Sequence, residues 1–419
     1  MRPAFGARFA VLRLRDFRVF AYGYAPSMLG TLMAGVALAF AVLDSGGSPA
    51  TLSYVLAARI VPMVAVLPFA GVLGDRFPRR LVMLWADVLR AGAQAAIAVL
   101  FFVGTPDLGP LLVLAALGGL GEAIFRPSFD GLVPQLVPAD RRHEANTLLG
   151  LVQSTASVAG PALAGVLVVV TSPATVLLID AVTYVPSILA LLWLRVPDPD
   201  PAGRTSMLRE MREGWRLFAS LPWLWTITLQ FTLFNLLLWA PYLVLGPVSA
   251  DRWYGGAGAW GAIAAMYGAG AILGGLVVLG WKPARPLLIA TAATILWAAP
   301  SAALAARAPL LVVCGGALVA GVVSAIFGTL WMTAIHQRVP PEAMSRVNSY
   351  VVFGSFSIGP IGLALAGPAA TATSITTVLS VGVAWQLTSG LLLLTLPAIR
   401  HFRNAPPVLA ESTGETTKA

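Results

Sequence analysis

The stretch QLVPADRRHEAN at residues 135–146 returns 202 residues later as QRVPPEAMSRVN at residues 337–348. The matched positions are Gln135, Val137, Pro138, Asp140 and Asn146, which correspond to Gln337, Val339, Pro340, Glu342 and Asn348. The same offset relates AIF at residues 123–125 to AIF at residues 325–327, and Ala164-Gly165 to Ala366-Gly367. A repeat at one fixed offset indicates two structural units of the same kind. We therefore expect the chain to fold as two related halves of parallel topology.

Hydropathy indicates what each half contains. Of the 419 residues, 58% are hydrophobic and 11% are charged, and the mean hydropathy is +0.82. Soluble proteins are about 45–50% apolar and about 25% charged, so this chain lacks the charged surface of a soluble protein. Its apolar runs are near the ~20 residues that cross a bilayer as a helix. We predict an all-α membrane protein with twelve transmembrane helices, six in each half, at residues 18–43, 51–74, 81–104, 109–133, 146–170, 174–195, 223–248, 257–280, 286–306, 309–334, 347–368 and 373–398.

Lys and Arg gather in alternate connectors, and this bias sets the orientation of a membrane protein. The connectors after even-numbered segments carry Arg76, Arg79, Arg80, Arg141, Arg142, Arg204, Arg209, Arg212, Arg216, Lys282, Arg285 and Arg338. The connectors after odd-numbered segments carry only Arg252 and Arg307. Both termini are basic as well, so we expect them on the cytoplasmic side of the cell (inner) membrane. The net charge of +9 is thereby explained by topology and lipid contact, without a nucleic-acid partner.

The longest connector divides the chain. We predict an N-terminal six-helix bundle at residues 1–195, a cytoplasmic linker at 196–222, a C-terminal six-helix bundle at 223–400 and a disordered cytoplasmic tail at 401–419. The linker opens with Pro-Asp-Pro-Asp-Pro, which cannot be helical. Within it, residues 206–218 have an apolar face of Met207, Met211, Trp215 and Phe218 opposite arginines. This pattern predicts an amphipathic helix at the cytoplasmic interface, although a plain linker between two bundles remains an alternative.

The connector between the second and third segments reads GVLGDRFPRR at residues 71–80. It resembles the signature of the major facilitator superfamily, a Gly-x-x-x-Asp-Arg-x-x-Arg-Arg pattern, although Pro78 stands where the family often has Gly. The resemblance implies two halves that rock about a central site, and a cytoplasmic gate in which Asp75 pairs with loop arginines and with the start of the eleventh segment. The alternative is that the arginines only enforce topology. The expected gate residues are Gly71, Gly74, Asp75, Arg76, Arg79, Arg80 and Asp130.

The fifth segment contains GPALAG at residues 160–165. Gly160, Pro161 and Gly165 resemble the Gly-Pro motif of the antiporter branch of this superfamily, and Gly359-Pro360 is a displaced counterpart in the eleventh segment. Proline kinks a helix, and small residues allow close helix packing. The resemblance favours export over import; the alternative is ordinary small-residue packing. A wider resemblance, which includes ADVLRA at residues 86–91 and IDA at residues 179–181, is to bacterial exporters of the enterobactin-exporter and macrolide-efflux type.

Ionisable residues within membrane segments are expensive and are functional candidates. All six lie in the N-terminal half, namely Arg59, Asp87, Arg90, Glu122, Arg126 and Asp180. Glu122 is our first candidate for the proton-coupling carboxyl because it lies near the middle of the fourth segment. The alternative is a permanent ion pair between Glu122 and Arg126, which are spaced i,i+4. Asp87 with Arg90, and Asp180 with Arg59, have the same two interpretations.

The substrate is expected to be a small amphiphilic molecule such as a drug, siderophore or secondary metabolite. Tyr24, Gln230 and Asn235 are the predicted cavity residues, because the resemblance makes the first and seventh segments central. The chain has no P-loop for ATP, so a proton gradient is the expected energy source and no cofactor is expected. One cysteine and three histidines argue against a metal site. We expect a monomeric proton-coupled exporter and no enzyme; an importer or symporter, or a non-transporting sensor or scaffold, is the alternative.

Overall fold

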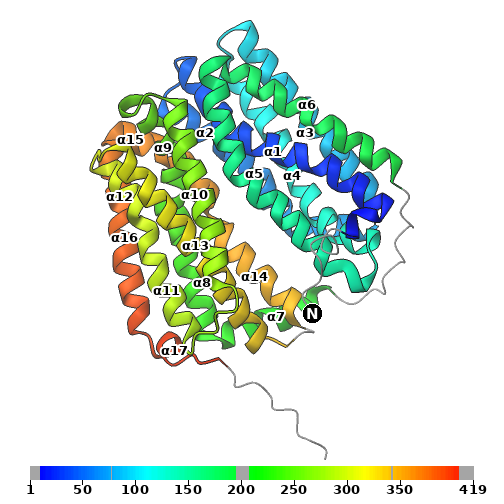
Figure 1. Ribbon diagram of the computed structural model, residues 1–419. Coiled ribbons are helices and arrows are strands. Elements are labelled where there is room, and N and C mark those ends of the chain that lie inside the picture. The colour runs from blue at the N-terminus through cyan, green and yellow to red at the C-terminus, as the bar shows by residue number, and fades with distance from the viewer. Residues whose placement is uncertain (1–9, 77, 195–206, 341–342, 405–419) are drawn as a thin grey trace, which may run out of the picture.

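The structure is a computed structural model that describes residues 10–76, 78–194, 207–340 and 343–404. Within those ranges the secondary structure is entirely helical, and twelve helical spans are long and apolar enough to cross a membrane. The predicted all-α class and the predicted number of spans are therefore confirmed. The helices form two bundles of six spans each that lie side by side (Figure 1).

The N-terminal half consists of six long helices. They are α1 (Arg15–Asp44), α2 (Pro49–Arg76), α3 (Arg79–Val103), α4 (Leu108–Leu136), α5 (Arg142–Val170) and α6 (Pro173–Trp193), with the short 3-10 turn η2 (Ala139–Arg141) between the fourth and the fifth. Helix α5 continues through Pro161. The Ser157 carbonyl, which lies four residues before this proline and cannot accept from it, instead faces Gly268 of the other half.

Three spans of the C-terminal half are interrupted. The seventh comprises α8 (Pro222–Phe234), η3 (Asn235–Trp239) and α9 (Ala240–Trp253); the ninth comprises α11 (Pro286–Ile295), η4 (Leu296–Ala298) and α12 (Ala299–Ala305); and the eleventh comprises α14 (Met344–Phe356) and α15 (Gly359–Ala372). The uninterrupted spans are α10 (Ala257–Val278), α13 (Leu310–Arg338) and α16 (Ile375–Thr395), and the short α17 (Pro397–Arg400) follows them.

Each interruption is explained by a proline. A proline lacks the N–H that bonds to the carbonyl four residues earlier, and its ring clashes with that carbonyl. For Pro241 the fourth preceding residue lies in η3, which is a π-helical turn. For Pro300 it is the first residue of the 3-10 turn η4, and for Pro360 it is the last residue of α14. Each break therefore lies beside a proline, at Pro241, Pro300 and Pro360.

The two halves make their tightest contacts at the end of the molecule away from the basic connectors, which we call the closed end. There Gly165 of α5 packs on Gly261 of α10, where an added Cβ would come within 2.9 Å of the Gly165 Cα. The Gly367 N–H of α15 donates to the Ser53 hydroxyl of α2 at 2.7 Å. An added Cβ on Gly367 would lie 2.1 Å from the Pro49 carbonyl oxygen, so only glycine fits. Gly165 and Gly367 are related by the 202-residue offset.

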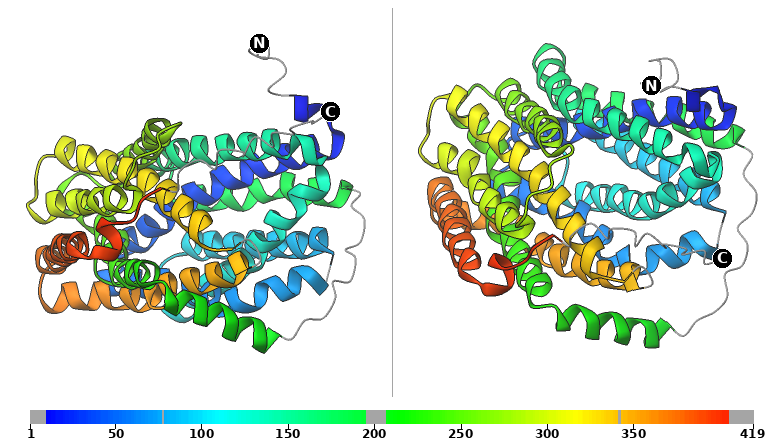
Figure 2. Two further views of the ribbon diagram at one scale, coloured as in Figure 1. Left: turned by 90° about the horizontal axis from the view of Figure 1, so that it is seen from below. Right: turned by 60° about the horizontal axis from the view of Figure 1, so that its bottom comes forward.

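The linker contains helix α7 (Met207–Ser220), which packs against α14 of the C-terminal half (Figure 2). The Trp215 ring contacts the rings of Phe218 and Tyr350, and Glu213 forms an ion pair with Arg346 at 2.7 Å. The Trp215 side chain remains 52% exposed, while Phe218 is buried. The apolar face of α7 is thus shared between the protein and its surroundings. The side chains of Met207 and Met211 lie outside the described residues.

Candidate functional site

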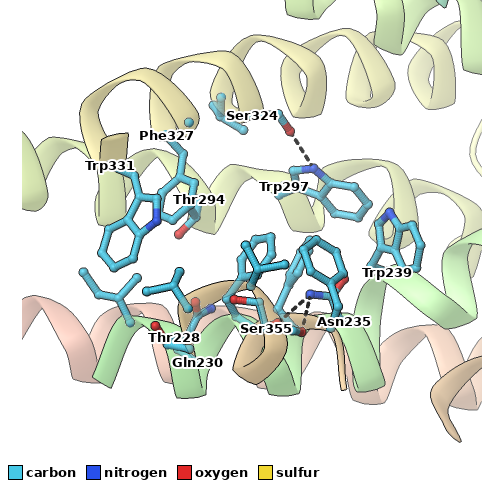
Figure 3. A pocket seen from close by; sticks show the side chains of 18 of the residues that line it. Thr228, Gln230, Asn235, Trp239, Thr294, Trp297, Ser324, Phe327, Trp331 and Ser355 are labelled. Carbon is cyan, nitrogen blue, oxygen red and sulfur yellow. Dashed lines mark hydrogen bonds between the residues drawn. The ribbon is translucent and has the colours of Figure 1, made fainter. Parts of the chain in front are cut away.

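A cavity of about 510 Å³ lies inside the C-terminal half, among α8, η3, α10, α11, η4, α13, α14 and α16 (Figure 3). Among the described residues, its lining contains no Asp, Glu, Lys, Arg or His side chain. The lining residues are Ile227, Thr228, Gln230, Phe231, Phe234, Asn235, Trp239, Tyr267, Thr294, Trp297, Val323, Ser324, Phe327, Gly328, Trp331, Met332, Asn348, Val351, Val352, Ser355, Phe356 and Gln386. This size and this apolar lining suit a drug-sized molecule.

Aromatic rings form most of the cavity wall. Phe327 stacks between Phe231 and Trp331, with ring centroids 5.9 Å apart in each pair. Trp297 meets Phe234 edge-on, at a centroid distance of 4.9 Å. Offset and edge-to-face pairs of this kind fix ring positions, so the wall is a set of oriented rings. Flat apolar groups of a ligand can stack on them.

Polar groups of the cavity are mostly bound to one another. Ser324 accepts hydrogen bonds from the Trp297 indole N–H at 2.9 Å and the Tyr267 hydroxyl at 3.0 Å, and donates to the Ala320 carbonyl at 2.8 Å. Figure 3 shows the Trp297 ring held toward Ser324 in this way. Because its donor is satisfied, the Trp297 ring can be buried there without a desolvation cost.

Amide side chains connect the spans around the cavity. The Gln230 amide donates to the Gln386 side-chain oxygen at 3.2 Å, and the Gln386 amide donates to the Thr294 carbonyl at 2.7 Å. The Asn235 amide donates to the carbonyls of Phe231 at 2.9 Å and Ser355 at 3.1 Å. Asn235 thereby joins the π-helical turn η3 to the end of α14. π-helical turns occur frequently at functional sites.

Two of the three predicted cavity residues, Gln230 and Asn235, line this cavity. Tyr24 does not: it packs in the core of the N-terminal half, against Phe129 at a centroid distance of 4.7 Å. The reason is that the cavity is built by one half, whereas we expected the first and seventh spans to share it. We did not single out Trp297 or Ser324, although the 202-residue offset from Glu122 points to Ser324.

Five charged side chains of the membrane spans form a separate, partly buried cluster in the N-terminal half, which we call the polar cluster: Arg59, Asp87, Arg90, Glu122 and Asp180. Arg59 of α2 binds Glu122 of α4 at 3.1 Å, with side chains 25% and 36% exposed. The alternative interpretation paired Glu122 with Arg126 within the fourth span, but Arg126 is exposed and makes no ion pair in the described part of the chain. Gly119 explains the difference. An added Cβ there would overlap the Arg59 carbonyl, so α2 approaches closely enough for Arg59 to reach Glu122.

The second pair in the polar cluster is Asp87 with Arg90, both on α3. Arg90 donates to one carboxylate oxygen of Asp87, and the Ser187 hydroxyl donates to the other at 2.6 Å. The Arg90 guanidinium lies over the rings of Phe125 at 4.1 Å and Tyr184 at 4.9 Å. Cation–π contacts and a carboxylate together stabilise this buried guanidinium, although its Nε has no hydrogen-bond partner among the described residues. This geometry matches the interpretation of a structural ion pair.

Asp180 of α6 lies beside these pairs without joining them. It is 1% exposed, and its Oδ1 atom accepts no hydrogen bond in the described structure. The pairing of Asp180 with Arg59, one of our two interpretations, is not found, because Arg59 binds Glu122 instead. The Gly30 backbone of α1 abuts the carboxyl, since an added Cβ on Gly30 would be 2.6 Å from Oδ1.

Comparison with models of protein families identifies the class of membrane protein to which the chain belongs. The model of the Major Facilitator Superfamily matches residues 20–363. The chain belongs to the Major Facilitator Superfamily. It is therefore a multi-pass membrane transporter of small molecules and not an enzyme, and the expected family and fold are confirmed.

Relatives within the superfamily are efflux pumps. The chain is 28% identical over 404 residues to multidrug efflux pump Tap of Mycobacterium tuberculosis, covering 90% of this chain and 94% of that one. It is 23% identical over 398 residues to macrolide efflux protein A of Streptococcus pyogenes, covering 92% and 95%. Among solved structures, it resembles a bacterial homologue of the iron transporter ferroportin with a TM-score of 0.69 at 17% identity, covering 91% and 98% of the two chains.

The superfamily's loop signature ends in two arginines whose contacts are described. Arg79 donates to the Gly131 carbonyl of α4, and Arg80 donates to the Leu194 carbonyl at the end of α6, so both connect the loop to their own half. Asp130 is exposed one residue before Gly131. The side chains of Gly71, Gly74, Asp75 and Arg76 lie outside the described residues, and the pairing of Asp75 stays a prediction. Helix α2, which carries them, does contact α14.

The two Gly-Pro motifs of the chain occupy different settings. In the N-terminal half, Gly160 packs against Leu32 of α1, while the Pro161 carbonyl contacts Gly261 of α10. In the C-terminal half, Gly359 begins α15 directly after the break, and no atom outside its own stretch of chain lies within 4 Å of an added Cβ. The first motif therefore lies at the contact between the halves, and the second lies at a helix break.

Proposed function

We propose that the chain is a secondary active exporter that moves small amphiphilic molecules out of the cell by alternating access, driven by proton antiport. The observation that carries the proposal is the division of the molecule into an uncharged aromatic cavity in one half and a buried polar cluster in the other. A cargo site and a site for a coupling ion are the two parts that an antiporter needs.

The cavity lining supports an uncharged or largely apolar cargo. Burying a charged ligand group is costly unless a partner is present, and the described lining residues include no acidic or basic side chain. Stacked rings and amides instead favour flat apolar groups with a few hydrogen-bonding atoms. The printed names of the relatives, which include a macrolide pump and a multidrug pump, support this cargo class and an outward direction.

The contact between the halves supports alternating access. The tightest contacts lie at the closed end, and a rocking motion would exchange them for contacts at the basic end. With the basic connectors in the cytoplasm, the cavity of this conformation is loaded from inside the cell. The proposed location is therefore the inner membrane, with both termini cytoplasmic and a monomer as the working unit.

Transport assays on Trp297 variants test the proposal. Wild-type everted membrane vesicles energised by a proton gradient should accumulate a macrolide or a neutral planar dye, and adding either should move protons. Trp297→Ala removes a wall of the cavity and should weaken cargo binding roughly tenfold, or about 1.4 kcal/mol. Trp85→Ala is the matched control, because Trp85 is 67% exposed on α3. Accumulation with no proton movement, or equal loss in both variants, would contradict the proposal.

A further inference from the structure

The polar cluster contains three carboxyls and two arginines, so one carboxyl is left over. Glu122 is taken by Arg59, and Asp87 is taken by Arg90 and the Ser187 hydroxyl. Asp180 makes no ion pair in the described structure, although the positive charges of Arg59 and Arg90 act on it from nearby. If all five groups were charged, the cluster would carry one negative charge inside the membrane.

Groups from several helices surround the Asp180 carboxyl. On α1, the Gly30 backbone abuts Oδ1, and the Thr31 hydroxyl is 3.0 Å from the Tyr184 hydroxyl. On α6 itself, the Thr183 hydroxyl donates to the Asp180 backbone carbonyl at 2.6 Å and also lies beside the carboxyl. The charged groups from neighbouring helices are Arg59 of α2, Arg90 and Asp87 of α3, and Glu122 of α4. No described side chain supplies the missing hydrogen bond.

An ionised carboxylate in this position would lack water and a direct ion-pair partner, which is costly inside a membrane protein. A bound proton removes that cost. We propose that Asp180, and not Glu122, is the carboxyl that binds the transported proton. This inference rests on the proposed antiport, and it assigns the proton to one residue. The step is a simple protonation: the Asp180 carboxylate takes up one proton on an oxygen, and releases it when the other conformation brings a cation or water to the carboxyl.

Infrared spectroscopy tests the protonation without any transport. Purified wild-type protein at neutral pH should show the C=O absorption of a protonated carboxyl, and this band should disappear on titration to alkaline pH. Incorporating ¹³C-aspartate should shift the band, whereas ¹³C-glutamate should leave it in place. Asp180→Asn should abolish it, and Asp107→Asn, a change at an exposed acid, should not. A band that shifts with labelled glutamate, or survives in Asp180→Asn, overturns the assignment even if transport is proton-coupled.

Vesicle assays then connect the proton to transport. Asp180→Asn should lose cargo-induced proton movement and uphill export, yet keep exchange of labelled for unlabelled cargo, which needs no net proton transfer. Retained proton movement in Asp180→Asn, together with its loss in Glu122→Gln, would assign coupling to Glu122 instead. If the wild-type protein moves no protons with any cargo, the proposed antiport is wrong. The infrared measurement then still decides separately whether Asp180 is protonated. Thermal unfolding of each variant separates these losses from misfolding.

Discussion

Gly367 shows how much a single residue can decide in this molecule. Its N–H donates to Ser53 across the contact between the halves, and its missing side chain lets α15 touch the Pro49 carbonyl. Gly165 plays the equivalent part in the other half, against Gly261. Two glycines at equivalent repeat positions therefore allow backbone-to-backbone contact at the closed end. Close helix approach through small residues is how membrane helices pack without a hydrophobic driving force.

Replacing Gly367 with alanine should loosen the closed end. The new methyl group would lie 2.1 Å from a backbone oxygen that cannot move aside cheaply, at a cost of about 1–3 kcal/mol to this conformation. Spin labels on exposed Thr171 and Thr373 should report longer and broader distances by electron resonance. Gly275→Ala is the control, because nothing lies within 4 Å of its added Cβ. An unchanged distance distribution in Gly367→Ala would contradict this account of the closed end.

The sequence did not indicate which side chains on different helices would pair with each other. The i,i+4 spacing of Glu122 and Arg126 made a local pair the natural expectation, yet Arg59 is the partner because Gly119 brings α2 against α4. The close packing of α2 on α4 depends on a contact between Gly119 and Arg59, which are 60 positions apart. The periodicity of the sequence does not predict such a contact. Tyr24 packs against Phe129 and does not line the cavity described above; its position in the first span did not indicate which way the ring points.

Among the helices of this molecule, some prolines lie within continuous helices and others accompany a break. In the N-terminal half, α5 passes through Pro161 unbroken, whereas in the C-terminal half Pro241, Pro300 and Pro360 each accompany an interruption. All three interrupted spans contribute to the cavity wall, together with the uninterrupted helices α10, α13 and α16. Prolines could be located from the sequence, and the sequence also predicted the spans themselves. Whether each proline would bend or break its helix depended on packing that the sequence does not show.

Pro360→Ala tests what the break between α14 and α15 contributes. Restoring an N–H lets the helix continue from Phe356 and should stiffen the eleventh span. We expect slower export with cargo binding nearly unchanged, because Pro360 is not part of the cavity lining. Pro173→Ala is the matched control, since this proline begins α6, where its missing N–H is not needed. Transport rates in vesicles and cargo binding in detergent should be measured on both; equal rates would mean that the break is not used in the cycle.

Across the whole molecule, the repeat relates the helices of the two halves, but equivalent positions carry chemically different side chains. The 202-residue offset takes Arg59, Glu122 and Asp180 to Gly261, Ser324 and Gly382. The two glycines pack on neighbouring backbones, against Pro161 and Leu237, and Ser324 holds the Trp297 ring. The twelve spans and the two halves were predictable because hydropathy and repetition are properties of the chain itself. The placement of the cavity within one half was not, because it depends on which side chains of different helices meet inside the bundle.

The orientation of the whole molecule can be checked with reporters. A fluorescent protein that folds only in the cytoplasm should be bright when fused after residue 419, and a phosphatase active only outside should be inactive there, because the basic connectors stay inside. Fusions after Ser172, between α5 and α6, should give the opposite pair of signals. An active phosphatase at residue 419 would invert the topology and, with it, the proposed direction of loading.

The separation of the cavity from the polar cluster has a consequence for how this transporter can evolve. The lining residues lie between 227 and 386, whereas the polar cluster lies between 59 and 180. Mutations that reshape the aromatic wall therefore leave the buried charges untouched, and effects at sites without shared partners are approximately additive. We expect a population exposed to a new toxic compound to gain variants in one half of the gene while the other half stays constant. The range of exported compounds can then widen while the residues of the polar cluster stay unchanged.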